Sequence, residues 1–352
     1  MAHRVPAVAA FGLVALGPAL LLIWGAANGG WTLWAGFVWM AVATPMADTL
    51  IARGFGDADD GAGFRGAEFL LVVLAVVHLA LLVSALHALA NDWLTGWQRV
   101  ALFLGVGMWL GQVSNSFAHE LIHRGKRGLF RLGAAVYVSL LFGHHVSAHR
   151  LVHHVHVATD SDPNSARLGE SFWRFFPRAW LGAFRAGLVA ERKRADRTGR
   201  INPYVIWIGG AGLCLTLVLV LFGVRAMVDY LALCAYAQMQ LMLSDYVQHY
   251  GLRRRCADGR TEPIGPRHSW DAPHPLSSLA MVNAPRHSDH HLNPARVYPA
   301  LRLGPDDRPM LPYSLPVMGA LAMVPPVWRR VMDRRVARMM AVEERQAATV
   351  LH

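Results

Sequence analysis

The chain is poor in cysteine. It has three, Cys214, Cys234 and Cys256, and no two of them form a CxxC pair. An iron–sulfur cluster usually takes four thiolate ligands, so this chain cannot hold such a cluster or a rubredoxin-type centre. Any electrons that its chemistry needs must therefore come from another protein.

Charged residues are also scarce. They make up 16% of the 352 residues, against about 25% in an ordinary soluble domain. Apolar residues are concentrated in long blocks, and a helix needs roughly 20 of them to cross a bilayer. Six segments qualify, at about 8–26, 32–52, 67–90, 100–118, 203–223 and 227–247. We expect an all-α integral membrane protein with six transmembrane helices, the first a retained anchor because it lacks a convincing cleavage site.

Acidic residues are outnumbered by basic ones, 23 to 34. The stretch 124–200 alone carries fourteen lysines and arginines, whereas 91–99 and 224–226 hold only Arg99 and Arg225. Basic loops stay on the cytoplasmic side. The pattern predicts a multi-pass protein of a bacterial-type inner membrane with both termini in the cytoplasm.

The whole chain, 1–352, is predicted to be a single domain whose cytoplasmic cap is formed by 119–202 and 248–352. The net charge of +11 would suggest a nucleic-acid partner in a soluble protein. Here the orientation bias and the attraction to anionic lipid headgroups explain it. We therefore expect membrane lipid and no nucleic acid as a partner.

Histidine is the residue that carries chemistry in this sequence. Nine of the eighteen histidines form four clusters: His119 and His123; His149, His153 and His154; His249; and His287, His290 and His291. Neutral imidazole is the commonest metal ligand near pH 7. The nine could instead be separate interfacial histidines, but neighbouring buried imidazoles need a shared partner to offset desolvation.

The spacing brings the clusters to one depth. His119 and His123 are four residues apart, on one face of a helix, and a rise of about 1.5 Å per residue places them at the cytoplasmic end of the fourth span. The sixth span delivers His249 to a similar depth. Nine ligands exceed the four of a closed zinc site. The pattern indicates two ions with four or five imidazoles each, and it does not identify the metal.

Carboxylates near the clusters are candidates to orient the imidazoles through their second nitrogen. The nearest are Glu120, Asp162, Asp245 and Asp289. The alternative for each is a helix cap or a surface ion pair.

The histidine motifs resemble those of the integral-membrane alkane 1-monooxygenases. These are non-haem di-iron enzymes of the membrane fatty acid desaturase and hydroxylase superfamily. The matching words are His119-Glu-Leu-Ile-His, His149-Arg-Leu-Val-His-His, Tyr246-Val-Gln-His-Tyr-Gly-Leu and Arg286-His-Ser-Asp-His-His. The resemblance implies that all nine histidines are ligands of two iron ions, with no other catalytic residue. It also implies O2-dependent hydroxylation of the terminal methyl of medium- and long-chain n-alkanes to primary alcohols. The electrons would come from rubredoxin, which an NAD(P)H-dependent reductase reduces.

Two positions depart from the family pattern. The family commonly has Glu before the first histidine of the second cluster and before the histidine of the third, and this chain has Ala148 and Gln248 there. Both changes remove carboxylates that could orient a ligand, and neither removes a ligand.

The substrate would enter sideways from the bilayer, since burial of a saturated chain is worth roughly 0.8 kcal/mol per methylene. The resemblance places Trp39 and Met40 along the substrate channel, where bulk limits how deep an alkane reaches. The alternative is that both are interfacial or packing side chains.

Three other functions stay open. A fatty-acyl desaturase or hydroxylase shares the HxxxH and HxxHH clusters, and a xylene-type methyl monooxygenase is a closer relative. A non-enzymatic membrane metal-binding protein is the third. It would be expected to have ionisable ligands along the membrane path rather than at one end.

Overall fold

Helices make up almost all the regular structure of the computed structural model, which describes residues 7–51, 56–59, 63–304 and 308–350. The α-helices are α1 (Val8–Asn28), α2 (Thr32–Val38), α3 (Thr44–Leu50), α4 (Ala67–Ala90), α5 (Gly96–Trp109), α6 (Asn115–Ile122), α7 (Arg127–Ser139), α8 (His144–Ala148), α9 (His154–His156), α10 (Phe172–Thr198), α11 (Tyr204–His249), α12 (Pro275–Ala280), α13 (His287–Leu292), α14 (Leu315–Ala322) and α15 (Pro325–Val350). Three wide π-turns interrupt them: η1 (Trp39–Ala43), η2 (Leu110–Ser114) and η3 (His149–His153). A 3-10 turn, η4 (Tyr298–Ala300), and an antiparallel pair, β1 (Cys256–Ala257) and β2 (Arg260–Thr261), complete the structure.

Four helices among the described residues are long and apolar enough to cross a membrane. They are Val8–Asn28, Ala67–Ala90, Gly96–Ile122 and Tyr204–His249. The third of them is the continuous run of α5, η2 and α6. The expectation of an apolar, helical membrane protein is confirmed, and the expectation of six spans is met in part.

The other three expected spans correspond to helices that differ in form from the prediction. The segment 32–52 is the run of α2, η1 and α3, which the wide turn divides into short pieces. The segments 203–223 and 227–247 form one 46-residue helix with a kink at Gly223, where φ is 80°. Only glycine adopts that conformation without strain, so the chain reverses there between two helical halves. Residues 1–6 and 351–352, the termini predicted to be cytoplasmic, lie outside the described residues.

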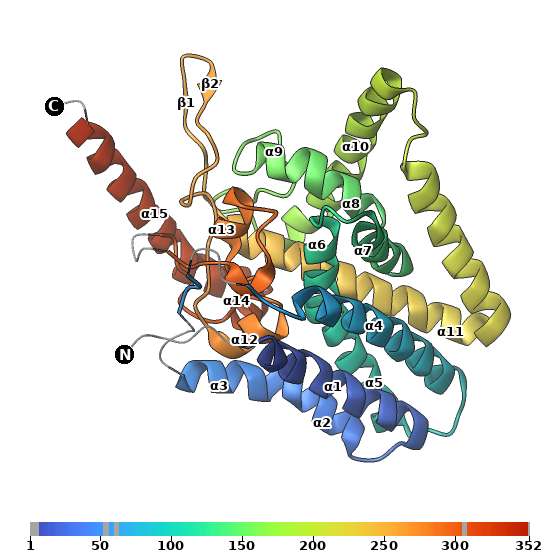
Figure 1. Ribbon diagram of the computed structural model, residues 1–352. Coiled ribbons are helices and arrows are strands. Elements are labelled where there is room, and N and C mark those ends of the chain that lie inside the picture. The colour runs from blue at the N-terminus through green and yellow to red at the C-terminus, as the bar shows by residue number, and fades with distance from the viewer. Residues whose placement is uncertain (1–6, 52–55, 60–62, 305–307, 351–352) are drawn as a thin grey trace.

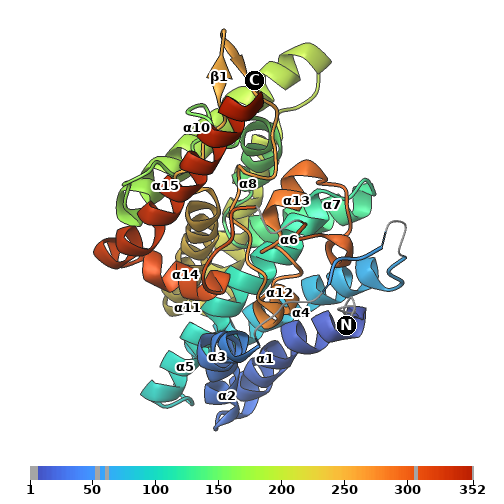
Figure 2. The same ribbon diagram turned by 90° about the vertical axis from the view of Figure 1, so that its left-hand side faces the viewer.

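The first apolar helices and the charged helices α10 and α15 lie toward opposite ends of the molecule. Figures 1 and 2 show α1, α2 and α5 at one end, and α10, α15 and the β-hairpin at the other. The helices α6, α8 and α13 meet between these two ends, beside the last turns of α11 (Figure 1). The histidine-bearing segments therefore lie between the first apolar helices and the charged helices.

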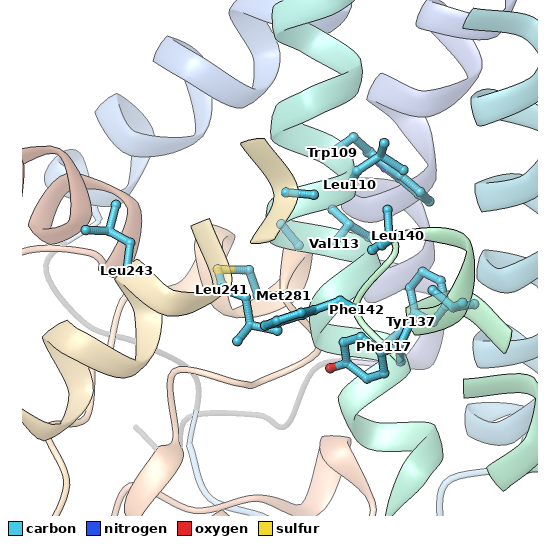
Figure 3. Packing of buried hydrophobic residues seen from close by; sticks show 14 of the residues in the cluster. Trp109, Leu110, Val113, Phe117, Tyr137, Leu140, Phe142, Leu241, Leu243 and Met281 are labelled. Carbon is cyan, nitrogen blue, oxygen red and sulfur yellow. The ribbon is translucent and has the colours of Figure 1, made fainter. Parts of the chain in front are cut away.

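A continuous apolar core supports this junction. Figure 3 shows Trp109, Leu110, Val113 and Phe117 along the run of α5, η2 and α6, and all four are fully buried. Phe142 packs on the cap side of the same core. The helix that ends in the first histidine pair is therefore held along its length.

Glycines let α11 approach this run closely. A Cβ on Gly107 would lie 2.2 Å from the Tyr236 ring, and one on Gly111 would lie 2.1 Å from the Gln240 amide nitrogen. Gln240 instead donates to the Gly107 carbonyl at 2.8 Å. Since both helices end in histidines, this contact fixes the distance between the first and third clusters.

Candidate metal centre

The first histidine pair lies at the end of α6. His119 is in its last turn, and His123 follows directly after it. Their ring centroids are 5.2 Å apart, as expected for residues at i and i+4. The Nε2 atom of His123 is buried and has no hydrogen-bond partner. It is therefore a free donor atom that faces inward.

The second cluster uses the wide turn η3. An α-helix would place residues i and i+5 on different faces, whereas a π-turn forms i to i+5 bonds. Accordingly, the Nε2 atoms of His149 and His154 are 2.9 Å apart. His153, between them, points toward a different set of imidazoles, and its ring centroid is 4.8 Å from that of His249. The turn thus places His149 and His154 of the HxxxHH motif in one group and His153 in the other.

The third and fourth clusters come from α11 and α13. His249 is the last residue of α11, and its Nε2 lies 3.0 Å from Nε2 of His287 at the start of α13. One turn later, His291 Nε2 is 3.1 Å from the same His287 atom. His290 points the other way, with its Nε2 2.7 Å from that of His119.

The nine side chains therefore form two groups. The group of five is His119, His123, His149, His154 and His290, and the group of four is His153, His249, His287 and His291. Within each group the candidate ligand atoms lie within 4.8 Å of one another. The groups are adjacent, because the rings of His154 and His291 have centroids 4.7 Å apart. The structure brings together all nine residues that the sequence singled out.

The nitrogen separations fit metal ligands. A nitrogen ligand lies about 2.1 Å from an ion such as zinc, so two ligands at right angles are about 3.0 Å apart. The inward-facing nitrogen pairs are separated by 2.7 to 3.1 Å. One proton per imidazole cannot satisfy so many convergent nitrogens. The donor set therefore suits cations, and nitrogen donors suit iron, zinc, copper and nickel alike.

Burial keeps these imidazoles neutral, which is the form that binds metal. It lowers the pKa of His149, His154, His287 and His290 well below the usual value, and like charges from neighbouring histidines add to the effect. His153 differs. Burial lowers its pKa, but the charge of Asp162 and its hydrogen bond outweigh burial and raise the pKa overall.

Two of the ligand candidates have a clear orienting partner on the second nitrogen. His153 Nδ1 lies 2.9 Å from the buried Asp162 carboxylate. His249 Nδ1 donates to the His268 backbone carbonyl at 3.2 Å. Both contacts turn Nε2 inward, as in metal sites where the outer nitrogen is hydrogen-bonded. Sequence reasoning could not find the second partner, because any residue supplies a carbonyl.

The other three candidate carboxylates hold the framework instead. Glu120 accepts from the Tyr298 backbone N–H at 2.9 Å and pairs with Arg124. Asp245 accepts from the Asn164 amide at 2.6 Å. Asp289 pairs with Arg296 at 2.6 Å. No hydrogen bond joins any of the three to an imidazole among the described residues, so their contacts resemble the alternative that the sequence left open, in which a carboxylate forms an ion pair or accepts from the framework.

Comparison with known proteins agrees with the resemblance that the histidine motifs carry. The fatty acid desaturase family model matches residues 91–322. An alkane 1-monooxygenase of Pseudomonas putida is 32% identical over 89% of this chain and 81% of its own length. Alkane 1-monooxygenase 2 of Alcanivorax borkumensis is 31% identical over 75% of this chain and 71% of its own. This chain belongs to the alkane 1-monooxygenase family. The resemblance seen in the sequence is confirmed, and the protein is an enzyme of the membrane desaturase and hydroxylase superfamily.

A more distant relative also spans most of the chain. The hydroxylase component XylM of a xylene/toluene monooxygenase from Pseudomonas putida is 23% identical over 93% of this chain and 85% of its own. The much higher identity of the alkane 1-monooxygenases favours that family over the xylene-type alternative.

The family's metal centre has a cavity beside it in this chain. The cavity measures about 90 Å³. His119 of the first cluster and His287 of the fourth cluster line it. Leu241 and Met281, drawn in Figure 3, also line it. His145 completes this wall and stacks on His149 with centroids 5.1 Å apart. Sequence reasoning left His145 out, because only the fold places its ring against a ligand candidate.

Trp39 and Met40 lie elsewhere. Met40 is buried in η1, and a Cβ on Gly17 would come within 2.9 Å of the Trp39 ring. Neither residue is among those that line the cavity at His119. Their assignment to a substrate channel stays a prediction about a path further from the metal centre.

At the two positions that depart from the family pattern, the fold has no carboxylate. Ala148 is buried under α10, where a Cβ on Gly187 would lie 3.1 Å from the Ala148 nitrogen. The Gln248 side chain donates to the Ala284 carbonyl at 3.2 Å and accepts from Ser244 at 3.0 Å. Gln248 thus ties α11 to the cap through neutral hydrogen bonds.

Proposed function

We propose that this protein is a di-iron, O2-dependent monooxygenase that hydroxylates the terminal methyl of n-alkanes to primary alcohols. The observation that carries the proposal is the division of nine buried or partly buried histidines into adjacent groups of five and four. It is supported by relatives named alkane 1-monooxygenase over most of the chain. Two irons held by these nine side chains would supply the activation of O2 and the transfer of one oxygen atom.

The chain's own residues would fix the irons and exclude water. Asp162 and the His268 carbonyl hold two imidazoles with Nε2 inward. The surrounding apolar core keeps the groups buried. The cavity at His119 and His287 would receive the methyl end of the substrate. Binding energy would come from burial of the alkyl chain, roughly 0.8 kcal/mol per methylene.

The electron donor in this proposal is rubredoxin, reduced by an NAD(P)H-dependent reductase. The chain has three cysteines, and none is paired in a CxxC motif, so it needs an external one-electron carrier. The basic cap suits an acidic soluble partner. The proposal also places six spans in the inner membrane, with the two halves of α11 counted separately, the run 32–50 as the second span and the cap in the cytoplasm.

Product analysis tests the proposal. Purified protein loaded with Fe(II) is given rubredoxin, its reductase, NADH and a mixture of dodecane, lauric acid, lauroyl thioester and xylene. The expected products are 1-dodecanol and oxidised NADH, with two irons per chain. Products from the acyl substrates alone would indicate a desaturase or fatty-acyl hydroxylase, and methyl alcohols from xylene alone would indicate a xylene-type enzyme. Metal binding without oxygen consumption would indicate a non-enzymatic protein.

A further inference from the structure

A large cavity outside the metal centre lies where the first half of α11 leaves the cap. It measures about 830 Å³, within the usual range of ligand pockets, and is lined by α7, α8, η3, the end of α10 and the start of α11. It is therefore separate from the small cavity at His119.

Five arginines line this cavity, and one carboxylate accompanies them. The arginines are Arg127, Arg131, Arg150, Arg194 and Arg200. The carboxylate, Glu191, is buried, accepts from Ser147 at 2.8 Å and lies 3.9 Å from Arg194. Arg150 and Arg194 are near enough to repel each other. The described lining therefore has an excess of positive charge that an anion would neutralise.

Most of the other lining residues are apolar. They include Ala135 and Val138 of α7 and Ile206 of α11. Ile206 is 61% exposed, and Ile201, just before the helix, is 80% exposed. Isoleucines so exposed at the start of a membrane helix are expected to contact lipid. The cavity thus joins a cationic rim to an apolar floor at the membrane boundary.

We propose that this cavity is a binding site for an anionic phospholipid, with the phosphate among the arginines and the upper acyl chain on the apolar floor. Basic pockets between transmembrane helices on the cytoplasmic side bind such headgroups. An acidic protein would match the charge, but it would not supply an acyl chain for the apolar floor beside the exposed Ile201 and Ile206. This binding site does not depend on which reaction the metal centre catalyses.

The position of Arg150 links the lipid to the metal centre. Arg150 lies in η3, directly after His149, and its guanidinium is 5.0 Å from the centre of the Phe130 ring on α7. A phosphate held by Arg150 and Arg194 would brace η3 against α10. Bound lipid is therefore expected to stabilise the segment that carries three of the nine histidines.

Lipid retention tests the proposal. The full chain is purified in detergent, mixed with equal amounts of phosphatidylglycerol and phosphatidylcholine, and examined by native mass spectrometry. We expect phosphatidylglycerol to be retained at least about tenfold better. The triple variant Arg131→Gln, Arg150→Gln, Arg194→Gln should lose that preference. The matched triple variant Arg185→Gln, Arg192→Gln, Arg197→Gln, with exposed arginines of α10 outside the cavity, should keep it.

A second variant guards against misfolding of the first. Ala135→Trp fills the apolar floor, leaves every arginine in place and should also reduce phosphatidylglycerol retention. Equal retention by the triple and matched variants would overturn the proposal. So would displacement of the lipid by millimolar inorganic phosphate alone, or capture of an acidic electron carrier at these arginines with no bound phospholipid.

Discussion

The Asp162 carboxylate lies 2.9 Å from Nδ1 of His153, and both groups are buried. The same carboxylate accepts from the Ser165 hydroxyl at 2.7 Å and from the Asn164 backbone N–H at 3.0 Å. A loop that follows the second cluster thus fixes one ligand candidate of the four-histidine group.

Asp162→Asn is expected to weaken metal binding by that group about 10- to 100-fold. The amide keeps the shape but removes the charge that orients the imidazole. Metal affinity is measured by competition with a calibrated chelator. Asp160→Asn, at an exposed neighbour, should leave the affinity unchanged, and an unchanged affinity in Asp162→Asn would contradict the role.

The two histidine groups should lose metal separately. His123→Ala removes a side chain of the five-histidine group, and His249→Ala removes one of the four-histidine group. Each variant is expected to fall from two irons per chain toward one, as measured by elemental analysis. His156→Ala, exposed and outside both groups, serves as the control. Loss of both irons from each variant would show a single linked site instead.

Substrate length should depend on where bulk is added. Met40→Trp is expected to shorten the preferred n-alkane, because the larger ring would block the far end of the proposed channel. Met281→Trp adds bulk in the cavity at His119 and His287, so it should reduce turnover of every length. Product profiles over a series of alkanes distinguish the two, and an unchanged profile in Met40→Trp would remove this residue from the channel.

Asp48 connects the first helical hairpin to the cap. Its carboxylate accepts from the backbone N–H groups of Leu276 and Ser277 at 2.7 and 3.0 Å, in the first turn of α12. Asp48→Ala should lower the free energy of unfolding by about 1 kcal/mol, as for a lost helix cap. Thermal unfolding in one fixed detergent measures the change. The exposed neighbour variant Thr49→Ala should lose less, and equal losses would count against the cap.

Two ion pairs near α6 should contribute differently to the free energy of unfolding, because one is buried and the other is exposed. Glu120 and Arg124 are 3.0 Å apart with side chains 5% and 6% exposed, whereas the Glu68–Lys126 pair is largely solvent-exposed. Breaking a buried pair costs roughly 3 kcal/mol or more, and an exposed pair about 1 kcal/mol or less. Glu120→Gln should therefore destabilise far more than Glu68→Gln in the same unfolding assay. Equal effects would mean that Arg124 finds enough compensation from the Arg296 carbonyl.

The sequence predicts much of the membrane part because hydropathy and length decide it. The segment 67–90 coincides with α4, and 100–118 lies inside the run Gly96–Ile122. The amphipathic helices α10 and α15 carry many charges, so a search for apolar runs passes over them. The kink at Gly223 depends on one backbone angle, which a glycine permits but does not require.

The nine histidines could be named from sequence, whereas their division into two groups could not. Spacing places His153 and His154 as neighbours, and only the wide turn sends them to different groups. The carbonyl of His268 is equally invisible to side-chain reasoning. Glu120, Asp245 and Asp289 were expected beside the imidazoles because they are close in sequence, but their carboxylates turn toward nearer amide, backbone and arginine donors.

Because of the wide turn η3, the grouping of the histidines depends on the number of residues between His149 and His154 as well as on the identity of those residues. Loss of one codon at Leu151 would preserve every histidine and still leave the spacing of an ordinary helix, with His149 and His154 four positions apart. His153 would then lie three positions after His149, on the same helix face as His149 and His154. A frame-preserving deletion that spares all nine side chains would thus remove the turn that separates His153 from its two neighbours, whereas a substitution of Leu151 by another aliphatic residue would keep that turn.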